Sequence, residues 1–181
     1  MKASELLNIG SKKLKTNSIK SFILDSEILL SKVLNKKREE VLVDLNQKIE
    51  NNKILEFLKY IDRRALKEPI AYIIQQKEFW SKNFEVSNKT LIPRPETELM
   101  LEKLINIYKK KSINILDIGT GSGCIILSLL SELKSSKGTG IDISFGALQI
   151  AKKNAKKLNI LGNVRFQKKS IDSFFSQKFD L

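Results

Sequence analysis

The chain has 181 residues, of which 41% are hydrophobic, and this composition is typical of globular proteins rather than disordered ones. It contains no histidine and one cysteine, which excludes Ser-His and Cys-His nucleophiles, an internal disulfide and a thiolate zinc cluster. The formal charge of +13 comes from 33 basic residues spread along the chain, and five arginines leave 28 of these as lysines. We interpret this excess as a solvated lysine-rich surface, which argues against direct nucleic-acid binding.

No apolar stretch approaches the roughly 20 residues that span a bilayer, and the first residues lack the apolar core of a signal peptide. We therefore expect a cytoplasmic protein with no membrane partner. Residues 1–75 show apolar side chains at spacings of three and four, as at Ile54, Phe57, Leu58 and Ile61, which predicts short helices. Each is apolar on one side, so a small helical bundle that docks or supports a substrate is expected.

Residues 76–92 lack the helical spacing of the preceding segment, and in them aromatic pairs flank a polar turn expected at 81–83. This pattern favours a β-hairpin linker. Residues 93–181 then begin with a helix after Pro93 and Pro95, expected to be capped by Glu96 or Thr97. Strands and helices alternate from residue 113 onward, which predicts an α/β fold of the Rossmann-like type.

A glycine-rich turn, "DIGTGSG", lies between the strand expected at 113–118 and the next helix. No Gly-Lys-Ser/Thr follows it, which excludes a phosphate loop, and Cys124 stands where a dinucleotide motif needs its third glycine. Asp117 before the turn suits a ligand with a positive amino group, and Asp142 ends the next strand where a carboxylate can bind ribose. These features favour S-adenosylmethionine, and no metal site is indicated.

Two stretches carry a more specific resemblance: "LIPRPETE" at residues 91–98, and "ILDIGTGSGCIILSL" from residue 115. With them the chain resembles the peptide chain release factor glutamine methyltransferases. The resemblance implies a Rossmann-like methyltransferase domain that methylates the glutamine amide of the Gly-Gly-Gln motif in class I release factors, with S-adenosylmethionine as methyl donor. It also implies cofactor contacts at Asp117, Gly119, Thr120, Gly121, Ser122, Gly123, Asp142 and Ile171, and a substrate pocket at Pro93, Arg94, Pro95, Glu96 and Thr97.

Three departures from that family stand out. Gln75 replaces a glycine, and Ser170 and Ile171 stand where an acidic and an aromatic residue contact adenine, although Asp172 is close. The acceptor motif Asn-Pro-Pro-Tyr does not occur in the 181 residues, so we expect a C-terminally truncated, inactive chain with no catalytic residue of its own. Two alternatives stay open: a related adenine-directed nucleic-acid methyltransferase, and a non-enzymatic module that binds the ribosome or RNA.

Overall fold

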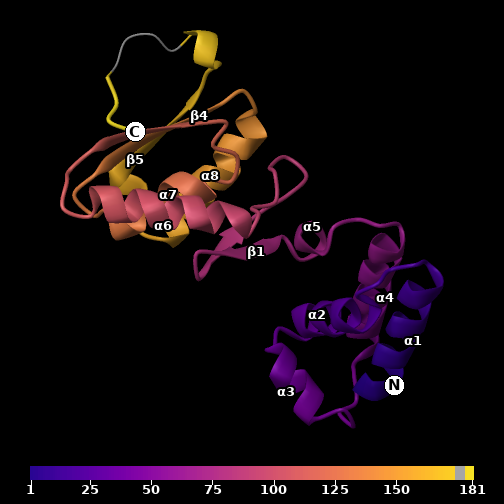
Figure 1. Cartoon of the computed structure of the whole chain (residues 1–181). Coiled ribbons are helices and arrows are strands. Elements are labelled where there is room, and N and C mark those ends of the chain that lie inside the picture. The colour runs from indigo at the N-terminus through magenta and orange to yellow at the C-terminus, as the bar shows by residue number, and fades with distance from the viewer. Residues whose placement is uncertain (174–177) are drawn as a thin grey trace. The chain divides into compact units, whose positions relative to one another are not determined.

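The computed structural model describes residues 1–173 and 178–181, which fall into two units, Met1–Ile74 and Gln75–Leu181 (Figure 1). The first contains only helices, and the second combines a hairpin with alternating strands and helices. This arrangement confirms the expected fold class of N-terminal helices, an antiparallel hairpin and a Rossmann-like domain. Within the described residues, none of the helices combines the length and apolarity that crossing a membrane would need.

Five helices make up the first unit: α1 (Ala3–Thr16), α2 (Phe22–Leu34), α3 (Arg38–Val43), α4 (Asn51–Ala65) and α5 (Ile70–Ile74). Helix α3 is only six residues long, and the chain after it pairs with the start of α1. The amide of Ala3 donates to the carbonyl of Gln47 at 3.1 Å, and that of Ser4 donates to the carbonyl of Leu45 at 3.0 Å. These carbonyls cap α1, so Ser4 lies inside the helix.

The helices of this unit share an apolar core that contains a buried ion pair. Asp25 of α2 is 4% exposed and accepts a hydrogen bond from Arg64 Nε of α4 at 2.6 Å. The hydroxyl of Ser21 also donates to Asp25, and Arg64 donates to the carbonyl of Glu68. Because both charges are paired and hydrogen-bonded, loss of either partner would leave a costly buried charge.

Strands β1 (Gln76–Phe79) and β2 (Lys82–Glu85) form the antiparallel hairpin of the second unit. Phe79 pairs with Lys82, so the turn consists of Trp80 and Ser81, earlier than the expected 81–83. Both turn residues have a φ of 51°, in the left-handed region. The hairpin places Phe79 and Phe84 in the core of the second unit, with ring centroids 6.3 Å apart in an edge-to-face arrangement.

The parallel sheet has the order β3 (Asn114–Ile118), β4 (Lys137–Asp142), β5 (Val164–Lys168). Around it lie α6 (Glu96–Tyr108), α7 (Cys124–Glu132), α8 (Phe145–Lys157) and the single turns η1 (Leu161–Asn163) and η2 (Ile171–Ser173). The end of the chain runs along β3, since the amide of Asp180 donates to the carbonyl of Asn114 and the amide of Leu116 to that of Leu181.

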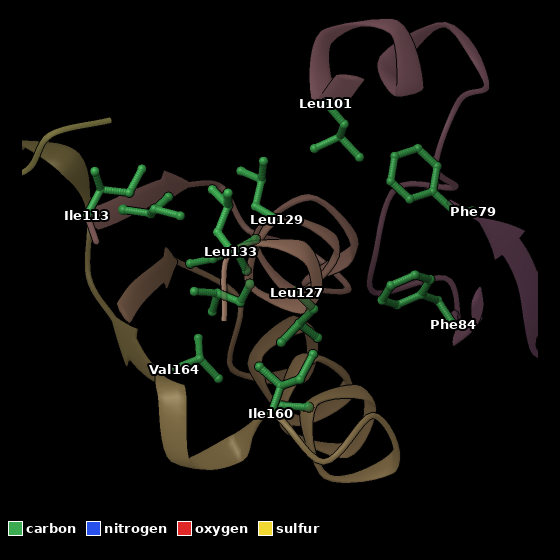
Figure 2. Close-up of a cluster of buried hydrophobic side chains, with 13 residues drawn as sticks. Phe79, Phe84, Leu101, Ile113, Leu127, Leu129, Leu133, Ile160 and Val164 are labelled. Atoms are coloured by element: carbon green, nitrogen blue, oxygen red, sulfur yellow. The ribbon is translucent and has the colours of Figure 1, made fainter. Parts of the chain in front are cut away.

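Figure 2 shows how the hairpin, helices and sheet share one apolar core. Phe79 and Phe84 of the hairpin lie beside Leu101 of α6 and Leu127 of α7, and Ile113 and Val164 come from the sheet side. All six side chains are at most 6% exposed. Burial on this scale ties the hairpin to the unit that carries the glycine turn.

Candidate functional site

The glycine turn occupies residues 119–123, between the carboxyl end of β3 and the start of α7. Gly119, Gly121 and Gly123 have φ values of 69°, 56° and 78°, which L-residues with side chains rarely adopt. A Cβ at Gly123 would lie 3.0 Å from Leu127 and 3.3 Å from Ala151, so close packing also requires glycine there. A Cβ at Gly119 would meet nothing within 4 Å. The turn therefore packs on the protein at one end and faces open space at the other.

Neighbouring elements hold this turn at three points. The amide of Thr120 donates to the carbonyl of Ile141 in β4 at 3.0 Å. The amide of Gly121 donates to Asp142 Oδ2 at 3.0 Å, and Asn154 Nδ2 of α8 donates to the carbonyl of Ser122 at 2.9 Å. The turn is thus fixed before any ligand binds, which reduces the entropy cost of binding.

Asp117 lies in β3 just before the turn. Its Oδ2 accepts a hydrogen bond from the Thr120 hydroxyl at 2.7 Å. Burial raises the pKa of the Asp117 carboxyl above its ordinary value, the Thr120 hydrogen bond opposes this rise, and the nearby Asp142 carboxylate adds to it. The two acidic groups Asp117 and Asp142 favour a cation at this end of the sheet, and the one basic side chain among the residues that line the adjoining cavity is Arg94.

Asp142 ends β4, and both of its carboxylate oxygens already accept backbone hydrogen bonds. Oδ2 accepts from Gly121, and Oδ1 accepts from the amide of Ser144 at 2.8 Å. Each oxygen of an ionised carboxylate can accept a second hydrogen bond. Asp142 therefore braces the glycine turn against the start of α8 and keeps acceptor capacity for a ligand.

A cavity of about 150 Å³ opens beside the turn. Seven of the residues expected at the site line it. Gly119, Thr120, Gly121 and Ser122 lie on one side, and Pro93 and Arg94 from the segment before α6 lie on the other with Thr97 of α6. Asp117, Gly123 and Asp142 are joined to this wall through the turn and its hydrogen bonds. The Ser122 hydroxyl is buried and has no hydrogen-bond partner among the described residues.

Besides Asp117, Gly123 and Asp142, three more expected residues are not in the lining of this cavity: Pro95, Glu96 and Ile171. Pro95 and Glu96 are exposed, and Pro95, with a φ of −56°, is itself the N-cap of α6 in place of Glu96 or Thr97. Ile171 is 46% exposed in η2 and lies outside the cavity lining. Beside it, the Ser170 hydroxyl donates to the carboxylate of Asp172 at 2.9 Å.

Several residues that complete the site were not expected from the sequence. Phe79, Leu91, Ile92, Cys124 and Ile125 also line the cavity. Burial raises the pKa of the Cys124 thiol to about 11, so it acts as an apolar wall and not as a nucleophile. Asn154 is 1% exposed and links the glycine turn to the hairpin. Its position on the apolar side of α8 was the available signal, because a polar side chain there must find partners.

A larger cavity of about 420 Å³ lies at the amino ends of the strands. Its lining includes Lys137, Arg165 and Lys178, and it contains none of the residues expected at the site. Three positive side chains make it a poor place for a cationic ligand. The site that suits a sulfonium and an amino group is therefore the smaller cavity at the glycine turn.

Comparison with known proteins adds to this geometry. Residues 5–74 match the family model of the PrmC N-terminal domain, and residues 109–181 match that of a methyltransferase domain. Among curated relatives, release factor glutamine methyltransferases from Buchnera aphidicola subsp. Schizaphis graminum and subsp. Baizongia pistaciae are 43% and 46% identical. The alignments cover 87% and 92% of this chain but 57% and 60% of those relatives, so the chain spans less than two thirds of their length.

A solved structure, a ribosomal protein L11 methylase from Lactobacillus delbrueckii subsp. bulgaricus, is similar to this chain at 28% identity with a TM-score of 0.42. The similarity covers 48% of this chain and 44% of that one.

Proposed function

We propose that the chain serves in methyl transfer from S-adenosylmethionine to the glutamine amide of the Gly-Gly-Gln motif of class I release factors, because residues 5–74 match the PrmC N-terminal domain and residues 109–181 match a methyltransferase domain. The observation that carries this proposal is the shared cavity. It brings Pro93, Arg94 and Thr97 of the "LIPRPETE" stretch against the glycine turn.

The residues at the turn fit S-adenosylmethionine in three respects. The open side of Gly119 leaves room for a ligand against the backbone. Asp117 places negative charge where the ligand's positive groups would lie, and Asp142 has acceptor capacity for the ribose hydroxyls. When bound, S-adenosylmethionine supplies an electrophilic methyl group on a sulfonium. The contribution of this chain is to bind and orient it, which is the main source of rate in such a displacement.

The segment before α6 forms the proposed substrate side. Pro93 is buried and Arg94 is exposed at the cavity, so one residue shapes the wall and the next can meet an incoming protein. In this proposal residues 93–97 line the entrance for the glutamine side chain, and residues 1–75 dock or support the release factor. Because that substrate is a translation factor, the proposed activity is cytoplasmic.

The test uses a chimera in which residues 1–181 are joined to the C-terminal remainder of one of the Buchnera relatives. Labelled methyl groups should be incorporated into a purified release factor and not into the same factor with the Gly-Gly-Gln glutamine replaced by alanine. DNA and RNA substrates run in parallel, because transfer to either would favour a nucleic-acid methyltransferase instead. Calorimetry should detect S-adenosylmethionine binding and no NAD binding. A folded chimera that methylates none of these substrates would contradict the proposal.

A further inference from the structure

The turn of the hairpin adopts a conformation that its residues disfavour. Trp80 and Ser81 both have a φ of 51°, where two-residue hairpin turns normally carry Asn-Gly or Gly residues. Such strain persists only when surrounding contacts hold the backbone, and it is concentrated at functional sites. The contacts that hold this turn therefore indicate what it is for.

Two carboxylates from different helices bind Trp80. Glu98 Oε1 of α6 accepts a hydrogen bond from the Trp80 backbone amide at 2.8 Å. Glu132 Oε1 of α7 accepts from the indole Nε1 at 3.1 Å, and Lys82 Nζ lies 3.5 Å from the same oxygen. The turn is thus attached to both helices that begin beside the cavity.

The local sequence explains why Glu98 reaches outward. It is the third residue of α6, where a glutamate normally accepts a hydrogen bond from the N-cap amide. In α1 and α3 this happens: Glu5 accepts from the amide of Lys2 at 2.9 Å, and Glu40 accepts from that of Lys37 at 3.0 Å. The N-cap of α6 is Pro95, which has no N–H. The carboxylate of Glu98 is therefore available to accept a hydrogen bond from the hairpin.

This single hydrogen bond joins two walls of the cavity. Glu98 directly follows Thr97, and Trp80 directly follows Phe79, and both Thr97 and Phe79 line the cavity. We propose that Glu98 is a positioning residue, which fixes residues 91–97 at the correct distance from the glycine turn by its bond to Trp80. The inference rests on the proposed function, because it assumes that this cavity binds S-adenosylmethionine.

The experiment uses S-adenosylhomocysteine as the probe in calorimetry, with the whole chain and three variants. Glu98→Ala removes the bond, Glu98→Asp shortens the side chain by one methylene, and Glu98→Gln keeps an acceptor oxygen. Glu102→Ala, at an exposed residue one turn further along α6, is the matched control. We expect Glu98→Ala and Glu98→Asp to weaken probe binding by about tenfold, the factor that a lost hydrogen bond of ordinary strength corresponds to. Glu98→Gln and the control should bind normally.

Trp80 is the only tryptophan, so its emission reports on the turn itself. The emission of folded Glu98→Ala and Glu98→Asp should move to longer wavelength as the turn loosens, and hydrogen exchange in residues 92–98 should accelerate, with Glu98→Gln unchanged. A purely stabilising role would lower the melting temperature and leave probe affinity intact below it. Normal affinity in folded Glu98→Ala or Glu98→Asp would therefore overturn the inference. If the unsubstituted chain did not bind the probe, the proposed cofactor would be contradicted first.

Discussion

Replacement of Asp117 by asparagine should separate the stability of the second unit from its affinity for a cationic ligand. Asparagine has nearly the same shape and keeps an oxygen that can accept from the Thr120 hydroxyl, so the change removes the charge and, of the hydrogen bonds, only the one from the Ile126 amide. The pKa of Asp117 is raised in the folded chain by burial. The stability that protonation contributes is therefore present at low pH and is lost as pH rises through the folded pKa. At neutral pH, Asp117→Asn should melt at the same temperature as the unsubstituted chain or higher.

Ligand binding should change in the opposite direction. A hydrogen bond to a charged group contributes about 1.5–3 kcal/mol, so affinity for S-adenosylmethionine should fall about 10- to 150-fold. At a ligand concentration 100 times the original dissociation constant, ligand stabilisation of about 2.7 kcal/mol should fall below about 1.4 kcal/mol. This difference corresponds to roughly 5–10 °C in melting temperature for a unit of this size.

The assay is thermal melting with and without ligand, followed by calorimetry at a series of decreasing pH values that starts at neutral pH. Affinity of the unsubstituted chain should decrease as pH falls through the raised pKa of Asp117, because the neutral carboxyl attracts a cation less, and Asp117→Asn should show a flatter profile. Glu102→Gln is the control for loss of one negative charge. Unchanged affinity in Asp117→Asn, or a ligand-free melting temperature several degrees lower, would refute the reasoning.

Three further predictions follow from single positions. Asp142→Ala should weaken S-adenosylmethionine binding by about 1–3 kcal/mol in calorimetry and also lower stability, because it removes the acceptor of Gly121; unchanged affinity would remove Asp142 from the site. Ser81→Gly should raise the melting temperature of the second unit by relieving about 1 kcal/mol of left-handed strain, and a lower value would show that the strain is absent. Gly10→Ala should destabilise the first unit by about 1–3 kcal/mol in denaturant unfolding, because its Cβ would lie 2.6 Å from a serine hydroxyl. Gly162→Ala, with open space around the new Cβ, is the control, and a Gly10→Ala variant as stable as this control would contradict the packing argument.

The elements set by local patterns could be predicted from the sequence. The strand, glycine turn and helix around residues 114–132 follow from an apolar run, three glycines and a second apolar run, and they occur in the structure as expected. The hairpin turn was expected later than it occurs, because Trp80 and Ser81 are unusual in the left-handed region and their conformation depends on Glu98. The early end of α3 likewise depends on distant partners, since the carbonyls of Leu45 and Gln47 pair with α1.

At the site too, residues set by a local motif could be predicted, and residues held by distant partners could not. The seven lining residues that were anticipated all belong to the two quoted stretches. Asn154 is buried in α8 among apolar residues, and its position in the sequence does not reveal which groups it binds. Its partners, Ser122 and Glu85, lie 32 and 69 residues away along the chain. Which distant carbonyls a buried amide will bind is decided by tertiary packing, and no spacing in the sequence encodes it.

The hydrogen bonds of Asn154 also set the minimum length of a segment that could be transferred to another protein and still fold. Its amide accepts from the backbone N–H of Glu85 at 2.7 Å and donates to the carbonyls of Glu85 and Ser122. A graft that began at residue 109, where the methyltransferase match begins, would lack the hairpin. Two of these three bonds would then be unmade, and the core would lose the buried side chain of Phe84. Each unmade bond costs about 1–3 kcal/mol, a large fraction of the stability of a small domain. A segment that is to be transferred between proteins and still fold should therefore start near Gln75, some thirty residues before residue 109, where the methyltransferase match begins.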